Sequence, residues 1–96
     1  MNKTYIASLC YQGLLGGGLI LDDERVTYRT GKLQVPPEIR NLPLPFCRIQ
    51  SVEKSKALFL PTVTIQMSDR NAWKFLVFGR NSFLTNLKSA MDAYSA

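Results

Sequence analysis

The chain contains no histidine, and this limits the chemistry that its other side chains could perform. Histidine is the usual general base near neutral pH and the commonest metal ligand, so neither a Ser-His-Asp nor a Cys-His arrangement can be built. The two cysteines, Cys10 and Cys47, lack CxxC spacing and do not predict a zinc site. We therefore expect no enzymatic activity, no catalytic residue, no metal ion and no cofactor.

Three consecutive acids, Asp22-Asp23-Glu24, are the densest group of possible cation ligands in the sequence. Consecutive residues on a turn rarely converge on one ion, whereas aspartate stabilises turns by accepting hydrogen bonds from the nearby backbone. The pattern predicts a solvated turn between two strands rather than a cation site.

Residues 13–18 include four glycines, a composition also found in phosphate-binding loops. Those loops lead into a helix, because the phosphate binds the N–H groups at the helix N-terminus. Here the apolar strand Leu19-Ile20-Leu21 follows instead. The glycine cluster is therefore interpreted as a bend or bulge of the backbone.

The charge balance favours an anionic partner, since 12 Lys and Arg oppose 7 Asp and Glu and give a formal charge of +5. The basic residues are scattered rather than blocked. They could form a weak anion-binding patch on one side of a sheet, or a merely solvated face. The candidate residues for this patch are Arg29, Lys32, Arg40, Lys54 and Lys56.

A second candidate surface is the apolar segment Leu58, Phe59 and Leu60, which precedes Pro61 and lies between two predicted strands. Apolar side chains at a hairpin tip could insert into a membrane or dock on a partner. Alternatively, they fold back on the core or extend a strand.

The remaining pattern predicts short strands followed by one helix. Alternation is clearest at 62–68, and apolar residues at helical spacing define a helix over 83–94, with Asn81 or Ser82 as N-cap. The proline-rich residues 33–45 are expected to form a loop, with an edge segment around 42–46. The other strands are expected at 4–12, 19–21, 26–29, 46–56 with a bulge, and 72–78.

These elements predict one domain, residues 1–96, that is mainly β with one C-terminal α-helix. We expect a bent antiparallel sheet or partly open barrel whose open end the helix caps, because the helix is marginal alone in water. We also expect Cys10 and Cys47 to be small buried thiols, and a bridge between them stays open. The sequence has no apolar stretch of membrane-spanning length, which favours a cytoplasmic protein, peripheral to a membrane at most.

Three segments together resemble a GRAM domain of the pleckstrin-homology-like superfamily. They are Gly18-Leu19-Ile20-Leu21-Asp22-Asp23-Glu24-Arg25-Val26-Thr27-Tyr28, then Pro45-Phe46-Cys47-Arg48-Ile49-Gln50-Ser51-Val52-Glu53-Lys54, and finally Trp73-Lys74-Phe75-Leu76-Val77-Phe78. The resemblance spans residues 4–87 and implies a seven-stranded bent sheet capped by one helix. It also implies a non-catalytic module that binds lipids, phosphoinositides or proteins. The first-hairpin segment 13–24 departs from the phosphoinositide-binding pattern because it has no Lys or Arg.

The function expected from these observations is a non-enzymatic binding module for a protein partner, including a second copy of the same chain. The alternative is a peripheral module for anionic membranes, with Phe59 as an apolar wedge. Nucleic acid is not an expected partner, and no small-molecule substrate is evident. The sequence leaves the ligand, the pathway and the oligomeric state open.

Overall fold

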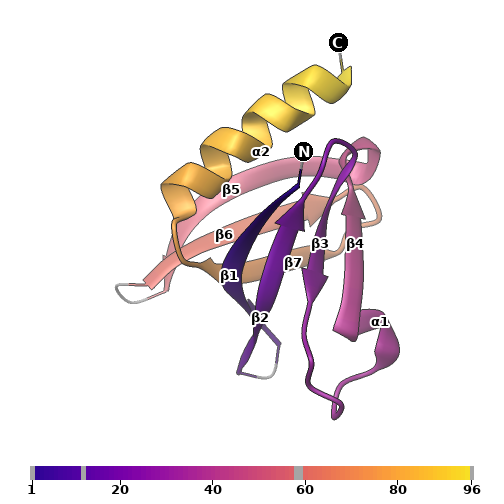
Figure 1. Cartoon of the computed structure of the whole chain (residues 1–96), viewed down its shortest axis with the longest axis vertical. Coiled ribbons are helices and arrows are strands. Elements are labelled where there is room, and N and C mark those ends of the chain that lie inside the picture. Colours follow the sequence, from indigo (N-terminus) through magenta and orange to yellow (C-terminus); the bar gives the residue numbers. More distant parts are fainter. Residues whose placement is uncertain (1, 12, 58–59, 96) are drawn as a thin grey trace.

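The computed structural model describes residues 2–11, 13–57 and 60–95, which form a curved sheet and a long C-terminal helix (Figure 1). The strands are β1 (Lys3–Cys10), β2 (Leu14–Leu21), β3 (Arg25–Arg29), β4 (Asn41–Pro45), β5 (Ile49–Ala57), β6 (Leu60–Met67) and β7 (Ala72–Val77). The helical segments are α1 (Pro37–Arg40), the 3₁₀ turn η1 (Phe46–Arg48) and α2 (Arg80–Ser95).

The strand order in the described residues is β4-β3-β2-β1-β7-β6-β5, and every neighbouring pair is antiparallel. β1 joins the two halves of this seven-stranded sheet, because it pairs with β2 along its length and with β7 through residues 7–9. The sheet closes part-way into a half-barrel, and α2 lies across one side of it (Figure 1). The mainly β fold with one C-terminal helix is thus confirmed.

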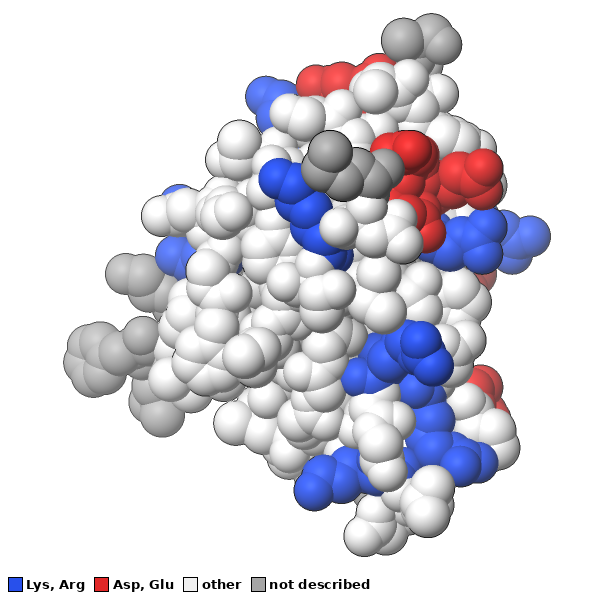
Figure 2. Space-filling model, viewed as in Figure 1, with Lys and Arg blue, Asp and Glu red and all other residues white. Residues whose placement is uncertain are grey.

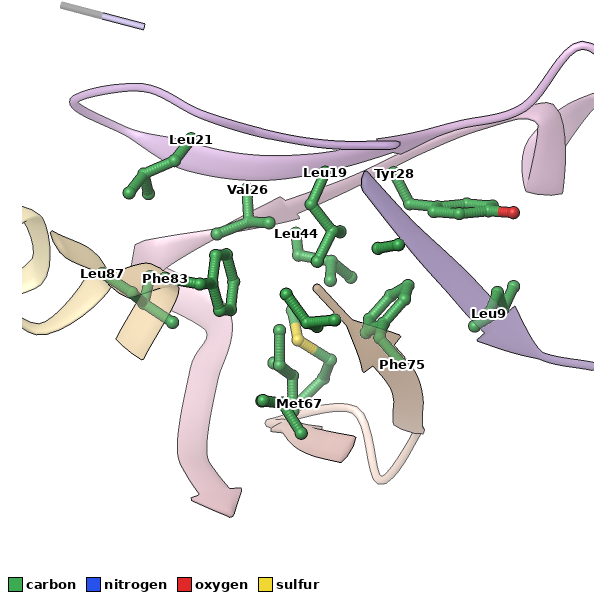
Figure 3. Packing of buried hydrophobic residues seen from close by; sticks show 14 of the residues in the cluster. Leu9, Leu19, Leu21, Val26, Tyr28, Leu44, Met67, Phe75, Phe83 and Leu87 are labelled. Carbon is green, nitrogen blue, oxygen red and sulfur yellow. The ribbon is translucent and has the colours of Figure 1, made fainter. Parts of the chain in front are cut away.

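The hydrophobic core lies between the inner face of the sheet and α2 (Figure 3). The alternation predicted along β6 is confirmed from Val63 onward, because Val63, Ile65 and Met67 are buried and the residues between them are more exposed. Thr62, which the alternation places on the opposite face, is buried as well, so the prediction is wrong at that residue. From α2, Phe83 and Leu87 complete the core, with exposed fractions of 0% and 1%. Since an isolated helix of this length is marginal in water, burial of this apolar stripe holds α2 in place.

Aromatic contacts tie the start of α2 to β1 and its end to η1. Near its start, the Phe83 ring meets Tyr5 edge-on with centroids 5.2 Å apart, and Asn86 Nδ2 donates to Tyr5 Oη at 2.6 Å. Near its end, Tyr94 meets Phe46 edge-on at 5.7 Å. These contacts come from elements far apart in the sequence, so they stabilise the docked helix as a unit.

The helix begins at Arg80, so the prediction of Asn81 or Ser82 as N-cap is wrong. Gly79 precedes the helix with φ +77°, and its carbonyl accepts the hydrogen bond of Phe83 N at 2.9 Å. A left-handed φ is accessible to glycine without strain, which lets the chain leave β7 and enter the helix earlier than the polar residues suggested.

The glycines of residues 13–18 are mostly strand residues of β2, so the predicted bend or bulge is wrong there. Only Gly13, with φ +112°, lies in the turn that precedes β2. At Gly17 a Cβ would lie 2.3 Å from the Arg29 carbonyl oxygen and 3.0 Å from the Tyr28 ring. The glycine therefore permits a close approach between β2 and β3 rather than a break in the strand.

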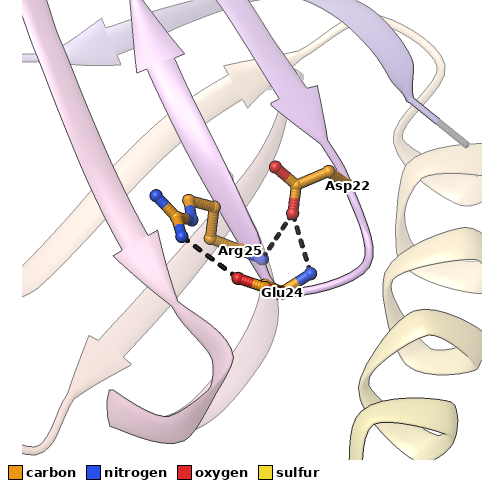
Figure 4. A network of polar contacts seen from close by, with 3 residues as sticks. All are labelled: Asp22, Glu24 and Arg25. Atoms are coloured by element: carbon orange, nitrogen blue, oxygen red, sulfur yellow. Dashed lines mark hydrogen bonds and ion pairs between the residues drawn. The ribbon is translucent and has the colours of Figure 1, made fainter.

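The acidic residues form the tight turn that was predicted (Figure 4). Asp22 Oδ1 accepts hydrogen bonds from the backbone N–H of Glu24 at 2.7 Å and of Arg25 at 2.8 Å. The Arg25 guanidinium also contacts the Glu24 carboxylate at 3.2 Å. The Asp22 carboxylate is therefore used to close the β2–β3 hairpin.

The proline-rich segment contains an edge strand, as predicted, and also the short helix α1, which was not predicted. Pro37 occupies the first turn of α1, where a missing N–H costs nothing, and Ile39 anchors α1 in the core. The predicted bulge is confirmed in β5 between Ile49 and Ser51. Residues 46–48 form η1 rather than the start of that strand.

The prediction of buried thiols is wrong, because Cys10 and Cys47 are both exposed and free. In β1 the buried residues Ala7 and Leu9 alternate with outward-facing ones, which places Cys10 outside. Cys47 lies on the outer side of η1. Of the helices in residues 2–11, 13–57 and 60–95, none has the length and apolar character needed to cross a membrane.

Candidate functional site

Three of the predicted basic residues gather at one corner of the molecule. Arg29 ends β3 opposite Asn41 of β4, and Thr30 N donates to the Arg40 carbonyl at 3.1 Å. Thr30 Oγ1 in turn accepts from the backbone N–H of Lys32 at 3.3 Å. Figure 2 shows the resulting group of Lys and Arg at the lower right, where β3, α1 and β4 meet. We call Arg29, Lys32 and Arg40 the basic corner.

The basic corner carries a net positive charge, because its three cations outnumber the single acid of α1, Glu38. Within the described residues, none of its cations forms an ion pair, and Arg40 Nε is buried without a hydrogen-bond partner. Leu33, next to Lys32, is 77% exposed. Unpaired cations beside an exposed apolar side chain can contact an anionic surface.

The other predicted site residues lie elsewhere. Lys54 belongs to β5, which is the opposite edge of the sheet from β4, so the structure does not bring it to the basic corner. Leu60 begins β6 and is 40% exposed. The side chain of Lys56 and the residues Leu58 and Phe59 lie outside the described part of the chain.

Among residues 2–11, 13–57 and 60–95, no strand pairs with the outer edge of β5, the last strand of the sheet. Met67 N of β6 donates to Asn71 on the β7 side, whereas Ser68 N donates to Arg48 on the β5 side. Because hydrogen-bonding direction alternates along a strand, the even-numbered residues of β6 face β5. Their partners are Ser51, Glu53 and Ser55.

It follows that Val52 and Lys54 direct their N–H and C=O groups away from β6. β5 is the last strand of the sheet, so these groups lie on its free edge. A free edge of this kind is a template for pairing with another strand.

A groove runs beside this edge, between β5 and α2, with a volume of about 340 Å³. Its apolar wall consists of Val52 from β5 and Leu84, Leu87 and Met91 from α2. Lys88 and Asp92 stand at its rim and contribute one charge of each sign. An apolar groove without net charge fits an apolar segment of a protein better than a polyanion.

The opposite edge strand, β4, cannot pair in the same way. Arg40 and Phe46 both hydrogen-bond on the β3 side, through Thr30 and Glu24, so even-numbered residues of β4 face β3. Pro43 and Pro45 therefore occupy outward-facing positions but have no N–H to offer. Of the two sheet edges, β5 is the one that can accept a strand.

The β5–α2 groove was not predicted from the sequence. Leu84 and Met91 belong to the apolar stripe at helical spacing over residues 83–94. The groove depends on their position relative to Val52, which is distant in sequence. The only local signal was the breadth of that stripe. In the described residues, no group of three or more His, Cys, Asp or Glu could hold a metal ion.

Comparisons with known proteins show the fold and no activity. No protein-family model and no curated protein matches the chain. Among solved structures, the chain is similar to the C-terminal domain of an unknown protein from Leishmania infantum, with a TM-score of 0.77 and 11% sequence identity. The match covers 93% of this chain and 81% of that one.

Proposed function

We propose that the protein is a non-catalytic, GRAM-like interaction module of the cytoplasm that binds a second copy of itself through β5. The observation that carries the proposal is the free edge of β5 beside an apolar groove. Strand addition supplies main-chain hydrogen bonds, and the groove accepts apolar side chains, a combination common in peptide recognition. The exposed free thiols of Cys10 and Cys47 are consistent with a reducing compartment.

The residues of β5 favour a two-fold symmetric antiparallel pairing centred on Val52. In that register, Val52 faces Val52 of the second copy, Lys54 faces Gln50, and Ser51 faces Glu53. Over the paired residues 49–55, no like charges lie opposite each other. A register centred on Glu53 or on Lys54 would place two like charges directly opposite, which is destabilising.

The same symmetry would place both α2 helices on one face of the continuous sheet. Leu84 and Met91, which are only partly buried, line the side of α2 toward β5. Their counterparts in the second copy could fill the groove. A two-fold contact of this kind is isologous, because the same patch is used by both copies.

The test is the molar mass in solution, measured by size-exclusion chromatography with light scattering over a range of concentrations. The wild type is expected to be a dimer, and Lys54→Pro a monomer, because proline removes an outward N–H. Lys54→Ala is the matched control, which removes the charge but retains the N–H, and should remain dimeric. A monomeric wild type at every concentration, or an unchanged Lys54→Pro dimer, would contradict the proposal.

A second variant pair tests the groove. Met91→Asp places a charge in the apolar wall and should dissociate the dimer. Thr85→Asp adds the same charge at an exposed position of α2 that does not line the groove, and should have no effect. Circular dichroism of each variant establishes that the sheet and helix are retained.

The basic corner supports a second candidate function, binding to anionic membranes. Its unpaired cations and the exposed Leu33 provide an electrostatic and an apolar contribution on one surface. This surface belongs to the β4 side of the sheet, so both functions could operate in one molecule.

A further inference from the structure

A second hollow lies beside β4, with no residue of α2 in its lining, and has a volume of about 370 Å³. Its walls are apolar and come from three elements: Leu42 and Pro43 of β4, Met67 at the end of β6, and Trp73 of β7. The size is at the lower end of the range for small-ligand sites, enough for one side chain and an end group.

The acidic group at the rim of this hollow is already committed to the β6–β7 turn. Asp69 Oδ1 accepts from the Asn71 backbone N–H at 3.0 Å, and Asp69 Oδ2 accepts from Asn71 Nδ2 at 3.2 Å. The Asn71 carbonyl accepts from Met67 N at 2.8 Å. The two bonds from Asn71 hold Asp69 in the turn and use about half of its acceptor capacity. Because Asp69 keeps its negative charge, a ligand carboxylate has to bind on the Arg48 side of the hollow.

Two residues that line the hollow, Arg48 and Trp73, have side-chain hydrogen-bond donors that are available to a ligand. In the part of the chain that the structure describes, neither the Arg48 guanidinium nor the Trp73 indole N–H has a hydrogen-bond partner. Arg48 lies on η1 and is exposed, while Trp73 is partly buried against the core. A planar cation with several donors, in a lining whose other walls are largely apolar, matches a carboxylate attached to an apolar body.

The free edge of β4 adds acceptors to the same hollow. Pro43 and Pro45 direct their carbonyl groups outward and cannot donate, so they can accept hydrogen bonds from a ligand N–H. A peptide end that enters the hollow would bring such an N–H next to its terminal carboxylate. A free organic acid would bring only the carboxylate.

We propose that this hollow binds an apolar carboxylate, with the carboxylate on Arg48 and the apolar body against Leu42, Met67 and Trp73. The chemistry is that of a peptide C-terminus with a hydrophobic last residue, or of a free aliphatic acid of similar size. The site is separate from β5, so it does not depend on the proposed self-association.

Trp73 is the single tryptophan of the chain and lies in the wall of the hollow, so its fluorescence reports on binding directly. The probes are 4-methylpentanoate and the peptide acetyl-Ala-Ala-Leu, each compared with its carboxamide. Both acids should change the emission saturably, and the amides should bind about tenfold more weakly, since the charge-assisted hydrogen bond is lost. Tighter binding of the peptide identifies the C-terminus as the source, and tighter binding of the free acid identifies a small organic acid.

Variants at the charged position complete the test. Arg48→Gln should abolish the difference between acid and amide, whereas Arg48→Lys should retain part of it, because a lysine keeps the charge but not the planar pair of donors. Arg25→Gln, at an exposed arginine that contacts Glu24, is the matched control and should behave as the wild type. Equal binding of acids and amides to the wild type, or no saturable change in Trp73 emission, would overturn the proposal.

Discussion

At the scale of single residues, position 17 has to be glycine because there is no room for a side chain, whereas the neighbouring Gly16 has room for one. A methyl group at position 17 would lie 2.3 Å from the Arg29 carbonyl oxygen, a backbone atom that cannot turn aside. We expect Gly17→Ala to lower the free energy of unfolding by about 1–3 kcal/mol through overpacking. At Gly16 no atom lies within 4 Å of the added methyl group, so Gly16→Ala should be neutral or slightly stabilising. Urea unfolding of the two variants measures the difference, and equal effects would contradict the assignment.

Tyr28 provides a second test, through pH. Its hydroxyl donates to the Leu15 carbonyl, and burial raises the pKa of Tyr28 because the phenolate would lose its water. With a raised folded-state pKa, the unfolded chain loses this proton first. The protonated Tyr28 hydroxyl therefore contributes fully to the free energy of unfolding at pH values below its pKa in the unfolded chain. This contribution is lost as the pH rises through the pKa of Tyr28 in the folded protein.

We therefore expect the free energy of unfolding of the wild type to fall more steeply above about pH 10 than that of Tyr28→Phe. At neutral pH the variant should be less stable by about 1 kcal/mol, because the Leu15 carbonyl loses its donor. Urea unfolding at a series of pH values gives both quantities. Parallel pH profiles would show that the Tyr28 hydroxyl ionises as freely in the folded protein as in the unfolded chain.

At the scale of elements, the two edges of the sheet are protected differently. β4 has prolines at its outward-facing positions 43 and 45, and β5 has none at 52 and 54. Replacing Pro43 and Pro45 together by threonine would add two outward N–H groups to β4. We expect the double variant to gain a concentration-dependent association that persists when Lys54→Pro is also present, because it uses the other edge. Light scattering of the triple variant measures this, and a monomer would show that the prolines do not protect the edge.

At this scale, the sequence predicted the elements that have a strong local pattern. The alternation of β6 from Val63 onward, the acidic turn at Asp22 and the stripe of α2 each depend on neighbouring residues, and each was confirmed. The glycines of β2 were misinterpreted because their strand conformation is imposed by pairing with β1 and, at Gly18, also with β3. The β5–α2 groove and the Trp73 hollow were missed because each joins segments that only the folded sheet brings together.

At the scale of the whole molecule, the charge is distributed unevenly. The acidic β2–β3 turn and the basic corner lie at opposite ends of β3, since the turn precedes Arg25 and the corner follows Tyr28. Figure 2 shows the acidic group toward the top and the basic group toward the bottom. A net charge of +5 alone would attract anions weakly from every side, whereas this arrangement orients the protein.

The orientation can be tested with variants of equal net charge. Arg29→Gln with Arg40→Gln removes two cations from the basic corner, and Lys54→Gln with Lys88→Gln removes two from the β5–α2 side. If the basic corner contacts anionic membranes, the double variant at Arg29 and Arg40 should bind phosphatidylserine vesicles about thirtyfold more weakly in cosedimentation. The factor follows because each cation near an anionic surface contributes about 1 kcal/mol to binding. The second pair should have little effect, and phosphatidylcholine vesicles should bind none of the proteins. Equal losses for both pairs would mean that net charge alone drives adsorption, and no binding by the wild type would exclude the membrane function.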